Sequence, residues 1–208
     1  MIYHSQNDRK KCFEGQDDYC PELLPFSIRE ELISKYLYHD LFTKYRRFFD
    51  AEALKDVRFQ YDITAGFLPR RFENSDDDKI IYDEDQEVAE MYFVTDGFVG
   101  IGFSLFSNGI SRQQTIMSQQ QRGRQMIGDH YVVNKSHSHF IYIALELTVG
   151  FALTRSFLHD YIFVKYPDIE VRIKGSTFNY FKNFIFRPID EHRKKEIEMM
   201  NVKRNIYR

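Results

Sequence analysis

A chain of 208 residues is long enough to bury a substantial core, and its 43% hydrophobic and 29% charged residues are typical of a soluble globular protein. The formal net charge of −2 provides no overall field that would attract nucleic acid, so we expect no nucleic-acid partner. No apolar run approaches the roughly 20 residues of a membrane span, and no signal peptide is recognisable, so we expect no direct insertion into a membrane.

The N-terminal quarter divides into a polar lead-in and a helical region. Residues 1–23 are polar and aperiodic, and we expect a flexible segment whose two cysteines, Cys12 and Cys20, stay reduced. Apolar residues then recur at helical spacing, and Ser27 with a glutamate three residues later has the form of a capping box. The sequence therefore predicts helices over 24–62, and we expect the helix–turn–helix over 24–49 to have an apolar face that the roll covers only in part.

Short strands predominate in the middle of the chain. Runs of β-branched and aromatic residues alternate with turn residues, and Asp96-Gly97 between two of them is a strong signal for a β-hairpin. The Gln-rich stretch 107–125 predicts a long exposed hairpin loop. This pattern favours an α+β fold: an antiparallel β-roll, or jelly-roll-like barrel, flanked by N-terminal helices and two C-terminal helices. The predicted strand regions are 66–73, 79–83, 90–97, 98–106, 126–133, 140–146 and 147–154.

The last quarter returns to helical periodicity. Thr154 can cap a helix over 155–166 that stops before the next proline, and a second helix follows over 168–187. Pro188 should kink or break that second helix, because proline removes a helical hydrogen bond. Residues 188–208 then continue as a charged, exposed helix or tail. Four apolar residues of the second helix share one stripe: Ile169, Ile173, Phe181 and Ile185.

Residues suited to catalysis or metal binding are present without a recognisable pattern. No nucleophile elbow, Walker loop or glycine fingerprint occurs, so we expect no enzyme and no catalytic residue. The acidic runs 76–78 and 83–85 fit no calcium loop and favour solvated turns. The stretch 127–146 holds three histidines and could form a metal site, an anion pocket or a plain strand pair; no zinc spacing matches, so we expect no metal. These histidines are His130, His137 and His139, with Asp129 as the neighbouring acid.

The stretch 72–103 reads as a strand, an acidic turn and a Met-Tyr-Phe strand that ends at a glycine. In this it resembles the opening strands of the cyclic nucleotide-binding domain family, and residues 151–173 resemble that family's last strand and closing helices. The resemblance covers residues 50–187 and implies a cyclic nucleotide-binding-like domain over 63–187. The residues that occupy the family pattern are Ile80, Ile81, Asp85, Met91, Tyr92, Phe93, Gly97 and Val99.

Residues 127–140 resemble the phosphate-binding cassette of that family. In binding members a Gly-Glu pair holds the ribose hydroxyl, a short helix follows, and an arginine pairs with the cyclic phosphate. Here a Gly-Asp pair stands at the first position and a Ser-His-Phe triplet at the second, so the arginine that would neutralise the phosphate is lost. The resemblance then implies a vestigial pocket whose acid has no cation beside it, closed by apolar side chains. We expect no cofactor, with cAMP or cGMP as the candidates otherwise. The pocket residues are Gly128, Asp129, Ser138, His139 and Phe140.

The helical stretch 24–49 resembles the C-linker of cyclic nucleotide-gated and related voltage-gated potassium channels. Its matching residues are Leu24, Pro25, Ile28, Arg29, Glu31 and Leu32. The resemblance implies a regulatory domain of an ion channel, on the cytoplasmic side of a membrane, with neighbouring subunits or the transmembrane part of the channel as partners. Three alternatives stay open: a nucleotide sensor with an altered phosphate contact, the regulatory tail of a sodium/proton exchanger, and a scaffold or adaptor that uses helix 189–204 and the Gln-rich hairpin.

Overall fold

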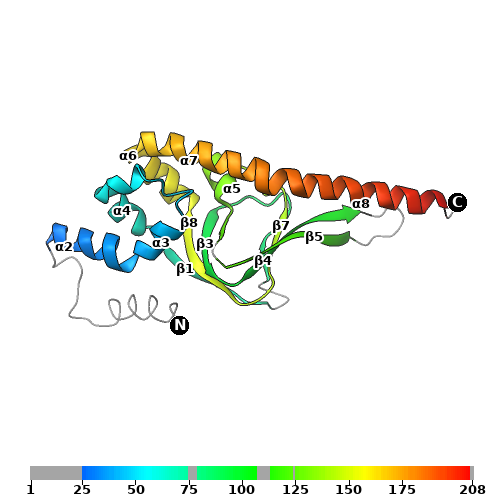
Figure 1. Cartoon of the computed structure of the whole chain (residues 1–208), viewed down its shortest axis with the longest axis horizontal. Coiled ribbons are helices and arrows are strands. Elements are labelled where there is room, and N and C mark those ends of the chain that lie inside the picture. Colours follow the sequence, from blue (N-terminus) through cyan, green and yellow to red (C-terminus); the bar gives the residue numbers. More distant parts are fainter. Residues whose placement is uncertain (1–24, 75–78, 107–112, 124, 207–208) are drawn as a thin grey trace.

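The computed structural model describes residues 25–74, 79–106, 113–123 and 125–206. Helices at both ends of the chain flank a central region of strands, and a long C-terminal helix runs along one side of the molecule (Figure 1). The predicted flexible lead-in and the acidic run 76–78 lie outside the described residues.

The described strands form two antiparallel sheets of four strands each. Their order is β1-β8-β3-β6 in the first sheet and β2-β7-β4-β5 in the second. The predicted α+β fold with an antiparallel β-roll is confirmed, and the strands lie in two separate sheets rather than in a closed barrel. The strands are β1 (Leu68–Phe72), β2 (Ile80–Tyr82), β3 (Glu90–Asp96), β4 (Phe98–Phe106), β5 (Gln113–Arg122), β6 (Gln125–Ile127), β7 (Ile141–Ala144) and β8 (Thr148–Thr154).

The Asp96-Gly97 step is a corner between the two sheets, so the predicted hairpin is wrong. β3 belongs to the first sheet and β4 to the second, and the two strands do not pair. Gly97 has a φ of +121°, and a Cβ there would lie 2.5 Å from the Cα of Thr148. The positive φ and the close backbone approach both require glycine, and a corner between sheets needs them as much as a hairpin does.

The Gln-rich stretch forms a regular strand where it is described, so the predicted exposed loop is wrong for residues 113–122. β5 pairs with β4 along its whole length, from Gln113 opposite Phe106 to Arg122 opposite Phe98. The apolar side chains of Ile116 and Met117 are half-buried in this ladder. The tip of the predicted loop, 107–112, lies outside the described residues.

The N-terminal helices begin at Phe26, directly after Pro25, so Ser27 lies inside the first turn and the predicted capping box is wrong. A true side-chain cap occurs later, where the carboxylate of Asp56 accepts hydrogen bonds from the backbone N–H groups of Arg58 (2.9 Å) and Phe59 (3.2 Å). The segments are α2 (Phe26–Glu31), the π-helical η2 (Leu32–Leu37), α3 (His39–Lys44), the 3-10 turn η3 (Ala53–Lys55) and α4 (Val57–Thr64).

These helices have an exposed first part and a buried second part. On α2 and η2, Ile28 is 50% and Tyr36 is 62% exposed. From α3 onward the side chains enter the core, where several rings pack on Phe93 of β3. The predicted partly covered apolar face is therefore confirmed for α2 and η2 and wrong for the second part. The buried rings are Phe42, Tyr45, Phe48, Phe49 and Phe59.

The first C-terminal helix consists of η4 (Phe157–Ile162), which is π-helical, and α6 (Phe163–Lys165). The Oγ1 of Thr154 accepts a hydrogen bond from the backbone N–H of Phe157 at 3.3 Å, which confirms the predicted cap. The helix ends before Pro167, as the sequence predicts.

The second C-terminal helix continues through Pro188, so the predicted break is wrong. α7 (Pro167–Tyr180), the π-helical η5 (Phe181–Phe186) and α8 (Arg187–Ile206) follow without interruption. Pro188 cannot donate a hydrogen bond to the carbonyl of Phe184, four residues earlier. The side chain of Gln119 on β5 donates to that oxygen instead, at 3.0 Å. A tertiary contact thus supplies the donor that proline lacks.

The charged α8 packs against the second sheet at its N-terminal half, which the prediction of an exposed tail missed. The Nδ1 of His192 lies 2.9 Å from the Oγ of Ser118 on β5, and Arg193 forms an ion pair with Glu84 in the turn after β2. The predicted acidic turn at 83–85 is confirmed, with Glu84 half-buried by this contact. Among the described residues, no helix has both the length and the apolar character needed to cross a bilayer.

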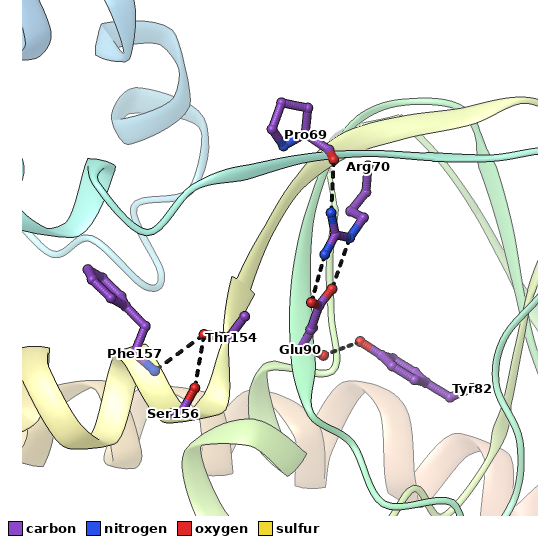
Figure 2. A network of polar contacts seen from close by, with 7 residues as sticks. All are labelled: Pro69, Arg70, Tyr82, Glu90, Thr154, Ser156 and Phe157. Atoms are coloured by element: carbon purple, nitrogen blue, oxygen red, sulfur yellow. Dashed lines mark hydrogen bonds and ion pairs between the residues drawn. The ribbon is translucent and has the colours of Figure 1, made fainter.

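A forked ion pair ties the first sheet together and positions one tyrosine of the second. Arg70 on β1 donates to the carboxylate of Glu90 on β3 through Nη2 (2.8 Å) and Nε (3.1 Å), across the intervening β8 (Figure 2). The backbone oxygen of Glu90 accepts a hydrogen bond from the hydroxyl of Tyr82 on β2 at 2.6 Å. The fixed side chain of Tyr82 then reaches the candidate site.

Candidate functional site

The candidate site lies between β6 and β7 and contains a short helix. The strand predicted over 126–133 ends at Ile127, and α5 (Asp129–Asn134) follows, so the strand prediction is wrong from Gly128 onward. Gly128 has a φ of +79° and Lys135 a φ of +53°, and these two left-handed residues bound the helix. A short helix at this place is what the resemblance to the cassette implies, and it is present.

Gly128 stands where the structure leaves no room for a side chain. A Cβ on this residue would lie 2.3 Å from the hydroxyl oxygen of Tyr82. Burial raises the pKa of the Tyr82 hydroxyl well above its ordinary value, so the group stays a neutral donor to its backbone partner. The glycine is thus used for packing against the chain's own tyrosine.

Asp129 is paired with a cation, which corrects the expectation that it has none. The Nη1 of Arg47, in the segment after α3, lies 2.9 Å from its Oδ2. Burial raises the pKa of the Asp129 carboxyl above its ordinary value, and the nearby Arg47 charge opposes that rise. The guanidinium of Arg47 also stacks on the ring of Tyr180 at 3.6 Å, and its backbone oxygen accepts a 2.7 Å hydrogen bond from Ser176. Arg47 therefore connects the carboxylate of α5 with the end of α7.

The polar groups of Ser138, in the second half of the cassette, form hydrogen bonds with other parts of the chain. The hydroxyl of Ser138, which is buried, donates to the backbone oxygen of Phe140 at 2.6 Å. The backbone of Ser138 bonds the turn after β2, accepting from Asp85 and donating to Gln86 at 2.8 Å each. Phe140 is buried in the core, while His139 is exposed and stacks on Tyr131. The position that resembles the family's arginine site thus carries a short side chain with its hydrogen bond already made.

The histidines of the site stack on aromatic rings. The ring of His130 lies parallel to that of Phe181 in η5, with centroids 4.0 Å apart and planes 4° apart. Burial lowers the pKa of His130 to about 4, and the neighbouring His139 adds to the shift. His137 instead pairs through its backbone with Glu87. Within the described part of the chain, no three histidine, cysteine or acidic side chains group as metal ligands would.

The space that α5 and the sheet would offer a ligand is filled by the C-terminal helix. A cavity of about 10 Å³ remains, which is the room needed for about one water molecule. Its walls include Asp129, His130 and Tyr131 of α5 together with Phe181 and Ile185 of η5. Both η5 residues belong to the stripe that the sequence predicts, and all four members of that stripe are buried.

Three residues that shape the site could not be predicted from the sequence. Arg47 and Tyr82 lie on segments remote from the cassette, and no local pattern marks either one. Tyr180 is adjacent to the predicted apolar stripe, but nothing in the sequence indicates a cation above its ring. Gly128 and Asp129 both line the small cavity beside α5, whereas Ser138 is not among the described residues that line it.

Comparisons with known proteins find similarity in structure only. No family model and no curated protein sequence matches the chain. The N-terminal domain of a transcriptional regulator from Streptomyces coelicolor A3(2) is similar with a TM-score of 0.50 at 14% identity, over 70% of this chain and 96% of that one. At this identity the likeness concerns the fold.

Two further solved structures are similar at lower TM-scores, and one of them is described as a putative cyclic nucleotide binding protein. The Thermus thermophilus Catabolite Activator Protein has a TM-score of 0.48 at 15% identity, over 76% of this chain and 63% of that one. A putative cyclic nucleotide binding protein from Ruegeria pomeroyi has a TM-score of 0.49 at 9% identity, over 71% of this chain and 61% of that one. The chain thus spans less than two thirds of the length of either protein. The antiparallel β-roll with flanking helices that the resemblance implies is present in this chain, and the Streptomyces coelicolor domain has a similar fold.

Proposed function

We propose that this chain is a non-enzymatic regulatory domain that keeps the cyclic nucleotide-binding fold and works without a nucleotide. The observation that carries the proposal is the closed cassette: His130 and Tyr131 of α5 lie under Phe181, and about 10 Å³ remains between the helix and the sheet. Ligand pockets are commonly about 300–1,000 Å³, so a nucleotide could enter only by displacing η5.

The charges of the cassette support the same proposal. A cyclic nucleotide brings a phosphate that must be paired when it leaves water. Ser138 offers no charge, and partial burial of the otherwise exposed His139 ring lowers its pKa from the ordinary value, which favours the neutral imidazole near pH 7. The cation that does reach the site, Arg47, is held by Asp129 and Tyr180. A phosphate bound in the cassette would have to compete with the buried Asp129 carboxylate for the Nη1 of Arg47.

We further propose that the domain belongs to an ion channel and acts on the cytoplasmic side of a membrane. The support is the resemblance of the first helix to channel C-linkers, together with the exposed Ile28 and Tyr36 on α2 and η2. An apolar surface of this kind suits a neighbouring subunit or the transmembrane part of the channel.

Isothermal calorimetry with cAMP and cGMP tests the closed cassette. We expect no saturable binding by the wild type or by Phe181→Ala, which makes room but adds no charge. Binding should appear in the double variant Ser138→Arg/Phe181→Ala, which has both. The matched control is Val171→Ala, an exposed apolar side chain on the same continuous helix, which should behave as the wild type.

Circular dichroism of each variant verifies that it is folded. Micromolar binding of either nucleotide by the wild type would overturn the proposal in favour of a nucleotide sensor. A folded double variant that fails to bind would mean that the closed pocket is not a former nucleotide site.

A further inference from the structure

A second cavity lies on the other side of the Arg47–Asp129 pair. Its volume is about 200 Å³, and its described walls come from the end of α3 and the segment after it, the end of β5, the start of β6 and the end of α7. Asp129 lines the small cassette cavity, whereas Arg47 lines this larger one. At 200 Å³ it is smaller than a typical pocket for a drug-sized ligand, and it suits a small ion or solute.

The walls of this cavity are basic. Lys44, Arg47 and Arg122 contribute to them from three different segments, and none of the described lining residues is acidic. Arg122 forms a 2.9 Å ion pair with Glu146, which lies outside the cavity. No described carboxylate pairs with Lys44. After Arg47 and Arg122 are balanced by their acidic partners, the cavity keeps one uncompensated positive charge.

Arg47 is held in place with donors to spare. Its Nη1 faces Asp129 and its plane stacks on Tyr180, so the orientation of the guanidinium is fixed before any ligand arrives. Within the described part of the chain, Nη2 and Nε make no hydrogen bond. A guanidinium offers five N–H groups in a rigid fork that matches the oxygens of a phosphate. Because the group is already ordered, a ligand would lose little binding free energy to its immobilisation.

The amide groups of the cavity add polar character. Gln121 and Gln125 both line it, and the Nε2 of Gln125 donates to the backbone oxygen of Gln121 at 3.1 Å. This bond fixes which end of the buried Gln125 amide is the donor. Its Oε1 is left without a partner among the described residues. A polar, incompletely satisfied wall of this kind suits a hydrated or hydroxyl-bearing ligand better than an apolar one.

We propose that this cavity binds a phosphoryl group, either as inorganic phosphate or on a small phosphomonoester. The ligand's oxygens would be shared among Lys44, Arg47 and Arg122, and a tetrahedral anion can accept from all three at once. The site is distinct from the cassette, and the proposal does not depend on whether the cassette takes a nucleotide.

Calorimetry with inorganic phosphate at constant ionic strength tests the proposal. We expect saturable binding with a dissociation constant of about 1 mM or below. Lys44→Met should weaken it about tenfold or more, because a lost charge-assisted hydrogen bond has an effect of that size. The matched control is Arg46→Met: Arg46 is exposed, lies beside Arg47 in the chain and does not line the cavity. It should change the affinity by about twofold at most.

A second titration with glycerol 3-phosphate distinguishes the two sources of the phosphoryl group: tighter binding than inorganic phosphate identifies a monoester, and weaker binding identifies the free ion. Circular dichroism confirms that both variants are folded. Absence of saturable phosphate binding by the wild type would overturn the proposal. So would equal losses in Lys44→Met and Arg46→Met, because binding would then follow net charge and not the cavity.

Discussion

Gly128 is the same residue type as the glycine of the family's cassette, but in this structure it has a different role. The resemblance assigns it to ribose binding, yet here its missing side chain makes room for the hydroxyl of Tyr82. Its φ of +79° is a second, independent reason for glycine, because a Cβ is strained in that conformation. A glycine at this position is therefore no sign that a nucleotide binds.

Replacing Gly128 with alanine should lower the free energy of unfolding by about 2–4 kcal/mol. The left-handed conformation contributes about 1–2 kcal/mol of this, and the contact with Tyr82 the rest. Gly175→Ala is the matched control: it lies in α7 with nothing near its Cβ position, and should raise stability by about 0.5–1 kcal/mol. Urea unfolding measures both. Wild-type stability in Gly128→Ala would contradict the packing argument.

Residues that act through local geometry could be predicted, and those that act through distant contacts could not. Gly128 and Asp129 are adjacent in the sequence, so their common place in the wall of the small cavity follows from local geometry. Arg47 reaches Asp129 only because α3 and the roll pack together. The expectation that Asp129 is unpaired was wrong for this reason, because the sequence around Asp129 does not reveal a cation that comes from a remote segment.

Helices and strands with one buried face were predicted well from the sequence. The prediction was wrong at a glycine and at a proline that can each occur in more than one kind of local structure. The order of helices and strands follows the periodicity of apolar residues. Gly97 marks a corner between sheets and not a hairpin, because a positive φ serves both. Pro188 leaves its helix continuous, because Gln119 of β5 bonds the carbonyl that proline leaves without a donor. That contact joins elements far apart in sequence, and no helical pattern reveals it.

The exposed side of α2 and η2 predicts self-association through these two helices. Light scattering should detect assemblies of more than one copy, and the double variant Ile28→Glu/Tyr36→Glu should dissociate them, because a carboxylate placed in an apolar contact costs about 2 kcal/mol or more. Val171→Glu, on the exposed side of α7, is the control and should assemble as the wild type does. A wild type that is monomeric throughout would remove the neighbouring subunit as a partner of these helices.

At the scale of the whole molecule, the N-terminal helices, the roll and the C-terminal helix all meet at α5. Arg47 approaches Asp129 from one side, and Phe181 covers His130 from the other. The closing of the cassette thus depends on contacts from both ends of the chain. The free energy of unfolding should therefore depend on whether the imidazole of His130 is protonated. A charged imidazole under Phe181 would oppose the packing that closes the site.

The pH dependence of that packing follows from the lowered pKa of His130. In the unfolded chain the ring takes a proton near its ordinary value of 6.5, whereas in the folded protein it does so only at about 4. The stabilising contribution is therefore complete above pH 6.5 and is lost as the pH falls from 6.5 to about 4. Burial lowers the pKa of His139 and of His159 as well, so these rings act in the same direction.

An NMR titration of the His130 ring tests the closed cassette most directly. The resonance is assigned by its loss in His130→Phe, a variant that keeps an aromatic ring against Phe181. We predict a midpoint of about pH 4, and no change of the resonance when cAMP is added at neutral pH. A midpoint near 6.5, or a shift of the resonance that saturates with cAMP, would show a cassette open to solvent or ligand and would contradict the account.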